Sequence, residues 1–132
     1  MDNRTTDSRI RIIKFALASV WTLVILALCS IPGSELPNVR IVSGDKVGHF
    51  IMFAAFGFLW MHALRLEVGA RFRWVIAAGL AYAVLTEVYQ GLMPFGREPE
   101  AWDAVANSAG LLAGVGGWHF LSRLRKREQQ LR

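Results

Sequence analysis

Hydrophobic residues in this chain gather in four long segments, and they do not recur as the stripes of amphipathic helices. Residues 15–34, 47–64 and 104–122 carry no charged side chain, and residues 74–96 carry only that of Glu87. About 20 consecutive apolar residues span the hydrocarbon core of a bilayer, which is roughly 30 Å thick. The pattern predicts an all-α polytopic membrane protein, a bundle of four transmembrane helices in a single domain, residues 1–132. We expect its helices over about residues 10–31, 45–66, 72–93 and 103–122.

Lysine and arginine residues are divided unequally between the two ends of these helices. Twelve of the 15 cations lie in residues 4–14, 65–73 and 123–132, and only Arg40, Lys46 and Arg97 lie at the opposite end. Cytoplasmic segments carry the excess of positive charge in membrane proteins. Both termini are therefore predicted to be cytoplasmic. The net charge of +5 follows from this topology, so we expect no nucleic-acid partner.

Cysteine usage excludes two kinds of stabilising site. Cys29 is the only cysteine, which rules out an intrachain disulfide, and no Cys/His spacing is typical of zinc. We therefore assign no metal site from spacing, and whether the protein uses a cofactor is unknown from the sequence. The first apolar segment is longer than a signal-peptide core and lacks a clear cleavage site, which favours a retained helix.

Polar side chains gather at the extracytoplasmic end of the three last predicted helices. Charged and amide groups at membrane depth are costly, so they usually face a bundle interior or a wet cavity. Asp45 and Asp103 also suit the first turn of a helix, and Glu87 could simply hold helices together. The placement nevertheless predicts one shared polar pocket that is open to the outside. Its candidate residues are Asp45, Lys46, His49, Glu87, Gln90, Arg97, Asp103 and Asn107.

Small residues follow Asn107 along the fourth predicted helix. Gly110, Gly114 and Gly117 recur at spacings of four and three, and so lie on one face of a helix. Small residues four apart allow two membrane helices to approach closely. We interpret these glycines as a packing stripe.

The polar residues form two ordered motifs, D-K-x-x-H-F and E-x-x-Q followed by R and D-x-x-x-N-x-x-G, and these resemble the motifs of VanZ-like membrane proteins. The resemblance implies an integral, multi-pass protein of the bacterial cytoplasmic (inner) membrane, and the namesake is associated with low-level resistance to the glycopeptide teicoplanin. Some relatives carry a phosphotransbutyrylase label, but the chain has no glycine-rich phosphate loop for that chemistry. The matching residues are Asp45, Lys46, His49, Phe50, Glu87, Gln90, Arg97, Asp103, Asn107 and Gly110.

The favoured hypothesis is a non-enzymatic protein that binds an envelope lipid headgroup or a cell-wall precursor at its outer face. Arg97 and Lys46 would contact phosphate or carboxylate groups, and arginine would do so in a bidentate fashion. Because no nucleophilic serine or cysteine stands out, binding is favoured over catalysis. The link to glycopeptide resistance comes from the resemblance alone.

Three alternatives stay open. A membrane-embedded hydrolase or transferase acting on a lipid-linked envelope precursor would use His49 as general base, helped by Asp45 or Asp103. The ligand types of Asp45, His49, Glu87 and Asp103 would also suit a divalent metal. A small proton-coupled transporter would use Glu87 as its carrier, and would need the chain to form a homodimer.

Overall fold

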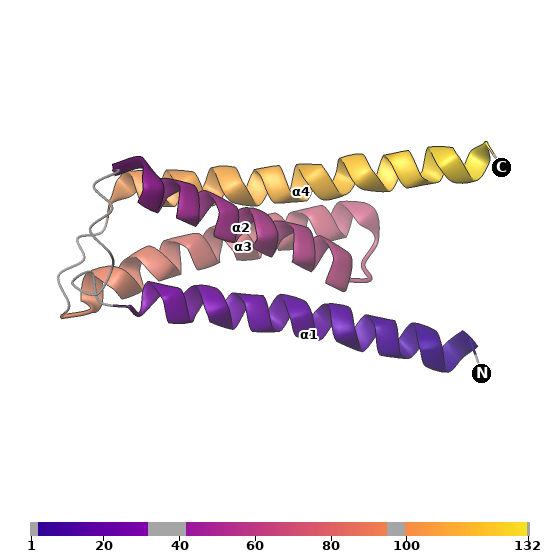
Figure 1. Ribbon diagram of the computed structural model, residues 1–132, viewed down its shortest axis with the longest axis horizontal. Helices are drawn as coiled ribbons and strands as arrows, with labels where there is room; N and C mark the ends of the chain where they lie inside the picture. The colour runs from indigo at the N-terminus through magenta and orange to yellow at the C-terminus, as the bar shows by residue number, and fades with distance from the viewer. Residues whose placement is uncertain (1–2, 32–41, 95–99, 132) are drawn as a thin grey trace.

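The computed structural model describes residues 3–31, 42–94 and 100–131, and within these ranges every regular element is an α-helix (Figure 1). The prediction of four helices is confirmed. In the described ranges they are α1 (Asn3–Cys29), α2 (Val42–Ala63), α3 (Val68–Leu92) and α4 (Ala101–Gln130).

Two of the helices extend well beyond their predicted bounds. α1 begins at Asn3 instead of residue 10, and α4 continues through the basic tail to Gln130 instead of ending at residue 122. The apolar pattern marks only the segment that can be buried in lipid. Lysine, arginine, glutamate and glutamine favour helical backbone, and no proline or glycine follows Gly117 to end α4.

The helices run alternately up and down, so that both termini lie at the same end of the bundle (Figure 1). The most extensive contact is between α2 and α4, which are not consecutive in the chain. α1 lies at the edge, mainly against α2. A turn at residues 64–67 joins α2 to α3, and Glu67 caps α3 by accepting hydrogen bonds from the backbone N–H groups of Gly69 and Ala70. These bonds hold the pKa of the Glu67 carboxyl below its usual value.

Glycine allows α2 and α4 to meet backbone to backbone. A Cβ atom at Gly110 would collide with the carbonyl oxygen of Phe50, and one at Gly114 would collide with that of Ala54. The predicted packing role is thus confirmed for these two glycines. It is wrong for Gly117, because a Cβ atom there would meet nothing within 4 Å.

Large side chains fill the space between α2, α3 and α4. The rings of Phe56 and Tyr82 stack with centroids 5.5 Å apart, and Leu111 of α4 is fully buried. The opposite, outward faces are apolar too, as in the exposed Leu23 of α1 and Leu85 of α3. An apolar exterior around an interior that also holds polar groups is typical of a bundle that lies in lipid.

Within the described residues, two helical segments are long and apolar enough to cross a membrane, Arg4–Cys29 and Val68–Leu92. α2 and α4 are also helices of 22 and 30 residues, but polar side chains interrupt their apolar runs. Two of these polar side chains, His49 in α2 and Asn107 in α4, are buried inside the bundle.

Hydrogen bonds from aromatic side chains fasten α1 to the other helices. Trp21 Nε1 donates to the carbonyl oxygen of Met52 at 3.0 Å. Thr22 accepts twice, from Trp60 Nε1 at its hydroxyl (3.1 Å) and from the Tyr82 hydroxyl at its carbonyl oxygen (2.7 Å). α1 therefore has a defined position despite its limited contact area.

Candidate functional site

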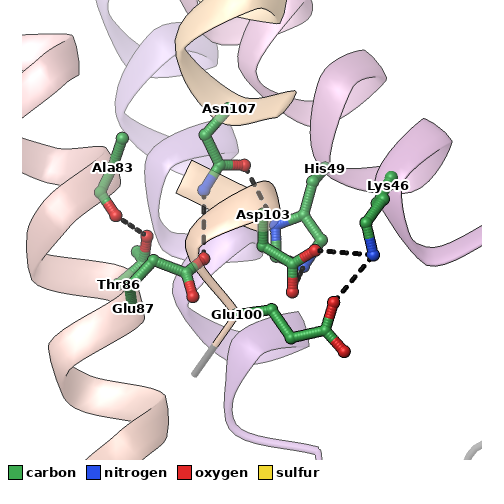
Figure 2. Close-up of polar contacts among 8 residues, drawn as sticks. All are labelled: Lys46, His49, Ala83, Thr86, Glu87, Glu100, Asp103 and Asn107. Carbon is green, nitrogen blue, oxygen red and sulfur yellow. Dashed lines mark hydrogen bonds and ion pairs between the residues drawn. The ribbon is translucent and has the colours of Figure 1, made fainter. Parts of the chain in front are cut away.

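Polar side chains from α2, α3 and α4 converge inside one end of the bundle (Figure 2). His49 is 2% exposed and Asn107 is fully buried. Glu87, Gln90 and Asp103 are also buried. Burying charged and amide groups is costly unless they bond to one another, so this arrangement requires defined partners.

Asn107 is the centre of the hydrogen-bonded chain in Figure 2, where its amide bridges α2 and α3. Its Nδ2 donates to Glu87 Oε1 at 3.3 Å, and its Oδ1 lies 2.9 Å from His49 Nδ1. An amide oxygen can only accept, so the hydrogen in the second bond belongs to His49 Nδ1. The network therefore selects the Nδ1–H form of the imidazole, and Nε2 either keeps its lone pair or carries a second proton.

Asp103 faces the other nitrogen of this imidazole. Its Oδ2 lies 3.9 Å from His49 Nε2, which is within ion-pair reach when the histidine is protonated. Asp103 lies in the first turn of α4, four residues before Asn107, and so both residues point to the same face of the helix. One helical turn thus supplies both groups that contact the imidazole.

Lys46 forms the solvent-facing rim of the cluster. Its Nζ lies 2.8 Å from Glu100 Oε2 and 3.8 Å from Asp103 Oδ1. The Lys46 side chain is 28% exposed and that of Glu100 is 56% exposed, so the rim pair is in contact with water. Exposed ion pairs contribute little free energy, which makes the Lys46–Glu100 contact easy to exchange.

Six of the eight residues that the sequence singled out are described at this end of the bundle, and side-chain hydrogen bonds or ion pairs join all of them except Gln90. Arg97 and the side chain of Asp45 lie outside the described residues. Gln90 is buried near the end of α3, one turn from Glu87, and its Nε2 has no hydrogen-bond partner among the described residues. The role of all eight residues in binding stays a prediction. The six are Lys46, His49, Glu87, Gln90, Asp103 and Asn107.

Sequence reasoning missed two neighbours of the cluster. The sequence does not single out Glu100, because glutamate is common in polar loops. The only sign of its place in the cluster is that it precedes Asp103 by three residues, about one helical turn. Thr86 is buried beside Glu87, but its hydroxyl donates to the carbonyl oxygen of Ala83 in its own helix at 2.8 Å. Thr86 therefore has a structural role.

One set of side chains in the described residues could hold a divalent cation. His49, Glu87 and Asp103 each offer a ligand atom, and these atoms lie within 4.8 Å of one another. Two ligand atoms bound to one ion can be at most about 4–5 Å apart, because each bond is roughly 2.0–2.5 Å long. Metal-binding histidines usually donate their second N–H to an oxygen, as His49 does to Asn107. The donor set thus suits a metal, although spacing in the sequence assigned none.

Comparison with known protein families gave one match. A family model with the description VanZ/LLP1 matches residues 3–122, which include α1 to α3, most of α4 and the whole polar cluster. Comparisons with curated proteins and with solved structures gave no match.

Proposed function

We propose, because the chain belongs to the VanZ/LLP1 family, that it is an integral membrane protein which binds the anionic headgroup of an envelope lipid or cell-wall precursor. The observation that carries the proposal is the polar chain His49–Asn107–Glu87, buried across three helices, with a partly exposed lysine at its rim.

Membrane insertion of all four helices is supported by how the polar groups are arranged. α1 and α3 are apolar enough to insert independently, and the polar residues of α2 and α4 meet each other inside the bundle. The start of α1, the α2–α3 turn and the end of α4 lie together at one end (Figure 1), and these segments hold most of the cations. The positive-inside rule then places that end, and both termini, in the cytoplasm of a bacterial cell.

This orientation directs the polar cluster to the extracytoplasmic face. There, Lys46 is the anion contact among the described residues, because its present partner Glu100 is exposed and exchangeable. A phosphate or carboxylate that displaces Glu100 gains a charge-assisted hydrogen bond from Lys46 Nζ. Arg97 is proposed as a second contact from its sequence position.

The buried part of the cluster fixes the ligand's surroundings. Asn107 holds His49 and Glu87 in place, and Asp103 lies between His49 and the rim lysine. Carboxylate and imidazole groups there accept or donate hydrogen bonds to hydroxyl and amide groups of a headgroup. In a bacterium that makes this protein, such binding would alter the supply or exposure of a cell-wall precursor, which is how we link it to teicoplanin susceptibility.

A hydrolase or transferase acting on a lipid-linked precursor is the second candidate function, and the tautomer of His49 favours it. With Nδ1–H held by Asn107, His49 Nε2 is the nitrogen able to take a proton from an attacking water or hydroxyl group. Asp103, 3.9 Å away, would stabilise the resulting imidazolium. The cation Lys46 would then stabilise charge that develops on the substrate.

Binding of a polyprenyl phosphate to the purified full chain in detergent tests the first proposal, with the polyprenol of the same length as the uncharged comparison. We expect the phosphate to bind at least about tenfold more tightly, because a hydrogen bond to a charged group contributes about 1.5–3 kcal/mol. Lys46→Gln should remove most of that preference. Lys126→Gln, which removes an equal charge near the other end of α4, should not.

Equal affinity for phosphate and alcohol, or equal loss in both variants, would refute headgroup recognition by this cluster. Release of inorganic phosphate during the same incubation, abolished by His49→Gln, would instead establish the hydrolase.

A further inference from the structure

A polar pocket lies at the end of the bundle opposite the cluster of His49 and Asn107. Its volume is about 260 Å³, slightly below the range typical of pockets for drug-sized ligands. Each of the four helices contributes a basic side chain to its lining, namely Lys14 of α1, His62 of α2, Arg71 of α3 and Arg125 of α4. Residues far apart in the chain thus form a single basic cavity.

Arg71 is the fixed member of this set. Its Nη1 donates to the carbonyl oxygen of Met61 at 3.3 Å and its Nη2 to that of Leu66 at 2.8 Å. The guanidinium also lies over the ring of Trp118, with its Cζ 5.1 Å from the ring centroid. All of these partners are neutral, so they hold the side chain without cancelling its charge. Its buried Nε has no acceptor among the described residues.

No acidic side chain lines the pocket, and in the described ranges no ion pair involves Lys14, Arg71 or Arg125. The nearby turn arginine, Arg65, is paired with Asp7 at 2.6 Å, so that carboxylate is already engaged. Three formal positive charges therefore surround one small cavity without a matching negative charge. Arg71 is fixed, and the exposed side chains of Lys14 and Arg125 can turn toward an anion that binds beside it.

We propose that this pocket binds the phosphate group of an anionic phospholipid in the cytoplasmic leaflet. Basic pockets between transmembrane helices on the cytoplasmic side are suited to such headgroups. The amphipathic ring of Trp118 lines the same cavity, as expected where a glycerol backbone enters the acyl region. The inference rests on the membrane insertion proposed above, and it is independent of the ligand at the extracytoplasmic end.

Binding of short-chain phosphatidylglycerol to the full chain in zwitterionic detergent tests the inference, with phosphatidylcholine of the same chain length as the neutral comparison. Lys14→Gln and Arg125→Gln each remove one pocket charge, and neither side chain makes a hydrogen bond or ion pair that holds helices together in the described residues. A basic residue at the membrane surface strengthens binding by about fivefold. We expect each variant to bind phosphatidylglycerol about fivefold more weakly.

The matched control is Arg123→Gln, which removes an exposed cation of α4 that does not line the pocket. It should leave the affinity within about twofold, whereas diffuse surface attraction would weaken with any lost charge. Equal weakening in Arg123→Gln and Arg125→Gln would overturn the proposal. So would displacement of the lipid by inorganic phosphate at millimolar concentration, because the pocket would then recognise phosphate alone. Failure of either kind leaves the polyprenyl phosphate experiment on Lys46 unaffected.

Discussion

The substitution Gly114→Ala should separate the two helices that hold the candidate site together. The added Cβ would collide with the carbonyl oxygen of Ala54, and the next closest atoms also belong to the α2 backbone. Backbone cannot rotate aside as a side chain does, so the helices must move apart by on the order of 1 Å to restore van der Waals distance. The 2.9 Å contact between His49 and Asn107 would then exceed hydrogen-bonding distance.

The expected cost has two parts. Overpacking of a close contact costs about 1–3 kcal/mol, and loss of a buried hydrogen bond costs about 1 kcal/mol more. Gly116→Ala is the matched control, because a Cβ atom there would meet nothing within 4 Å. Both substitutions bring the same gain in helix propensity, which cancels in the comparison. Gly114→Ala should therefore be less stable than Gly116→Ala by about 2–4 kcal/mol.

Unfolding of the two purified variants in mixed micelles, followed by circular dichroism as the denaturing detergent is raised, measures this difference. The predicted order is Gly116→Ala above the unchanged protein, and Gly114→Ala below it. Equal midpoints for the two variants would refute the backbone contact between α2 and α4. An unstable Gly116→Ala would show that its open face is occupied in the folded protein, which contradicts the same structure.

Two further predictions concern the site and the topology. Asn107→Leu removes the amide that joins the α2 histidine to the α3 glutamate, and should cost about 1–3 kcal/mol in the same assay. Ser108→Ala should cost less than about 1 kcal/mol, because the Ser108 hydroxyl bonds only within α4, and equal losses would contradict a bridging role for Asn107. In a Cys29→Ala background, a membrane-impermeant maleimide applied to intact cells should label a cysteine placed at residue 35. It should not label one at Gln129, and the reverse result would invert the proposed orientation.

The level of the site within the bundle could be predicted because chain connectivity determines it. Uncharged runs long enough to span a bilayer specify helices, and helices joined by short turns must alternate in direction. Residues at the start of α2, the end of α3 and the start of α4 therefore lie at one end. Burial followed from the cost of polar groups in lipid, and His49 and Asn107 are indeed inside.

The pairing of side chains could not be predicted from sequence. The contact of His49 with Asn107 depends on which faces of α2 and α4 meet, and only the two glycines at the interface hinted at this. The glycine pattern also misled at Gly117, which lies on nearly the same face as Gly110 but at a level where no neighbouring atom is within 4 Å of an added Cβ. Rim contacts such as Lys46 with Glu100 depend on the path of a loop, which hydrophobic periodicity does not describe.

The basic pocket shows the same limit at the opposite end of the bundle. Lys14 and Arg125 lie in segments where a cation count explains every basic residue by topology alone. Their meeting around Arg71 becomes visible only when α1 and α4 are placed in space. His62 lines this cavity as well.

The pairing of α2 with α4 determines when the candidate site can form during synthesis. More than 30 residues, those of α3 and its flanks, separate the last residue of α2 from the first of α4. Because ribosomes add about 5–20 residues per second, α4 follows α2 by roughly seconds. During those seconds the nascent α2 carries His49 without Asn107, and within the described residues α2 is not among the segments apolar enough to cross a membrane by themselves. The site is therefore completed only once α4 has been synthesised, although two of its three helices exist earlier.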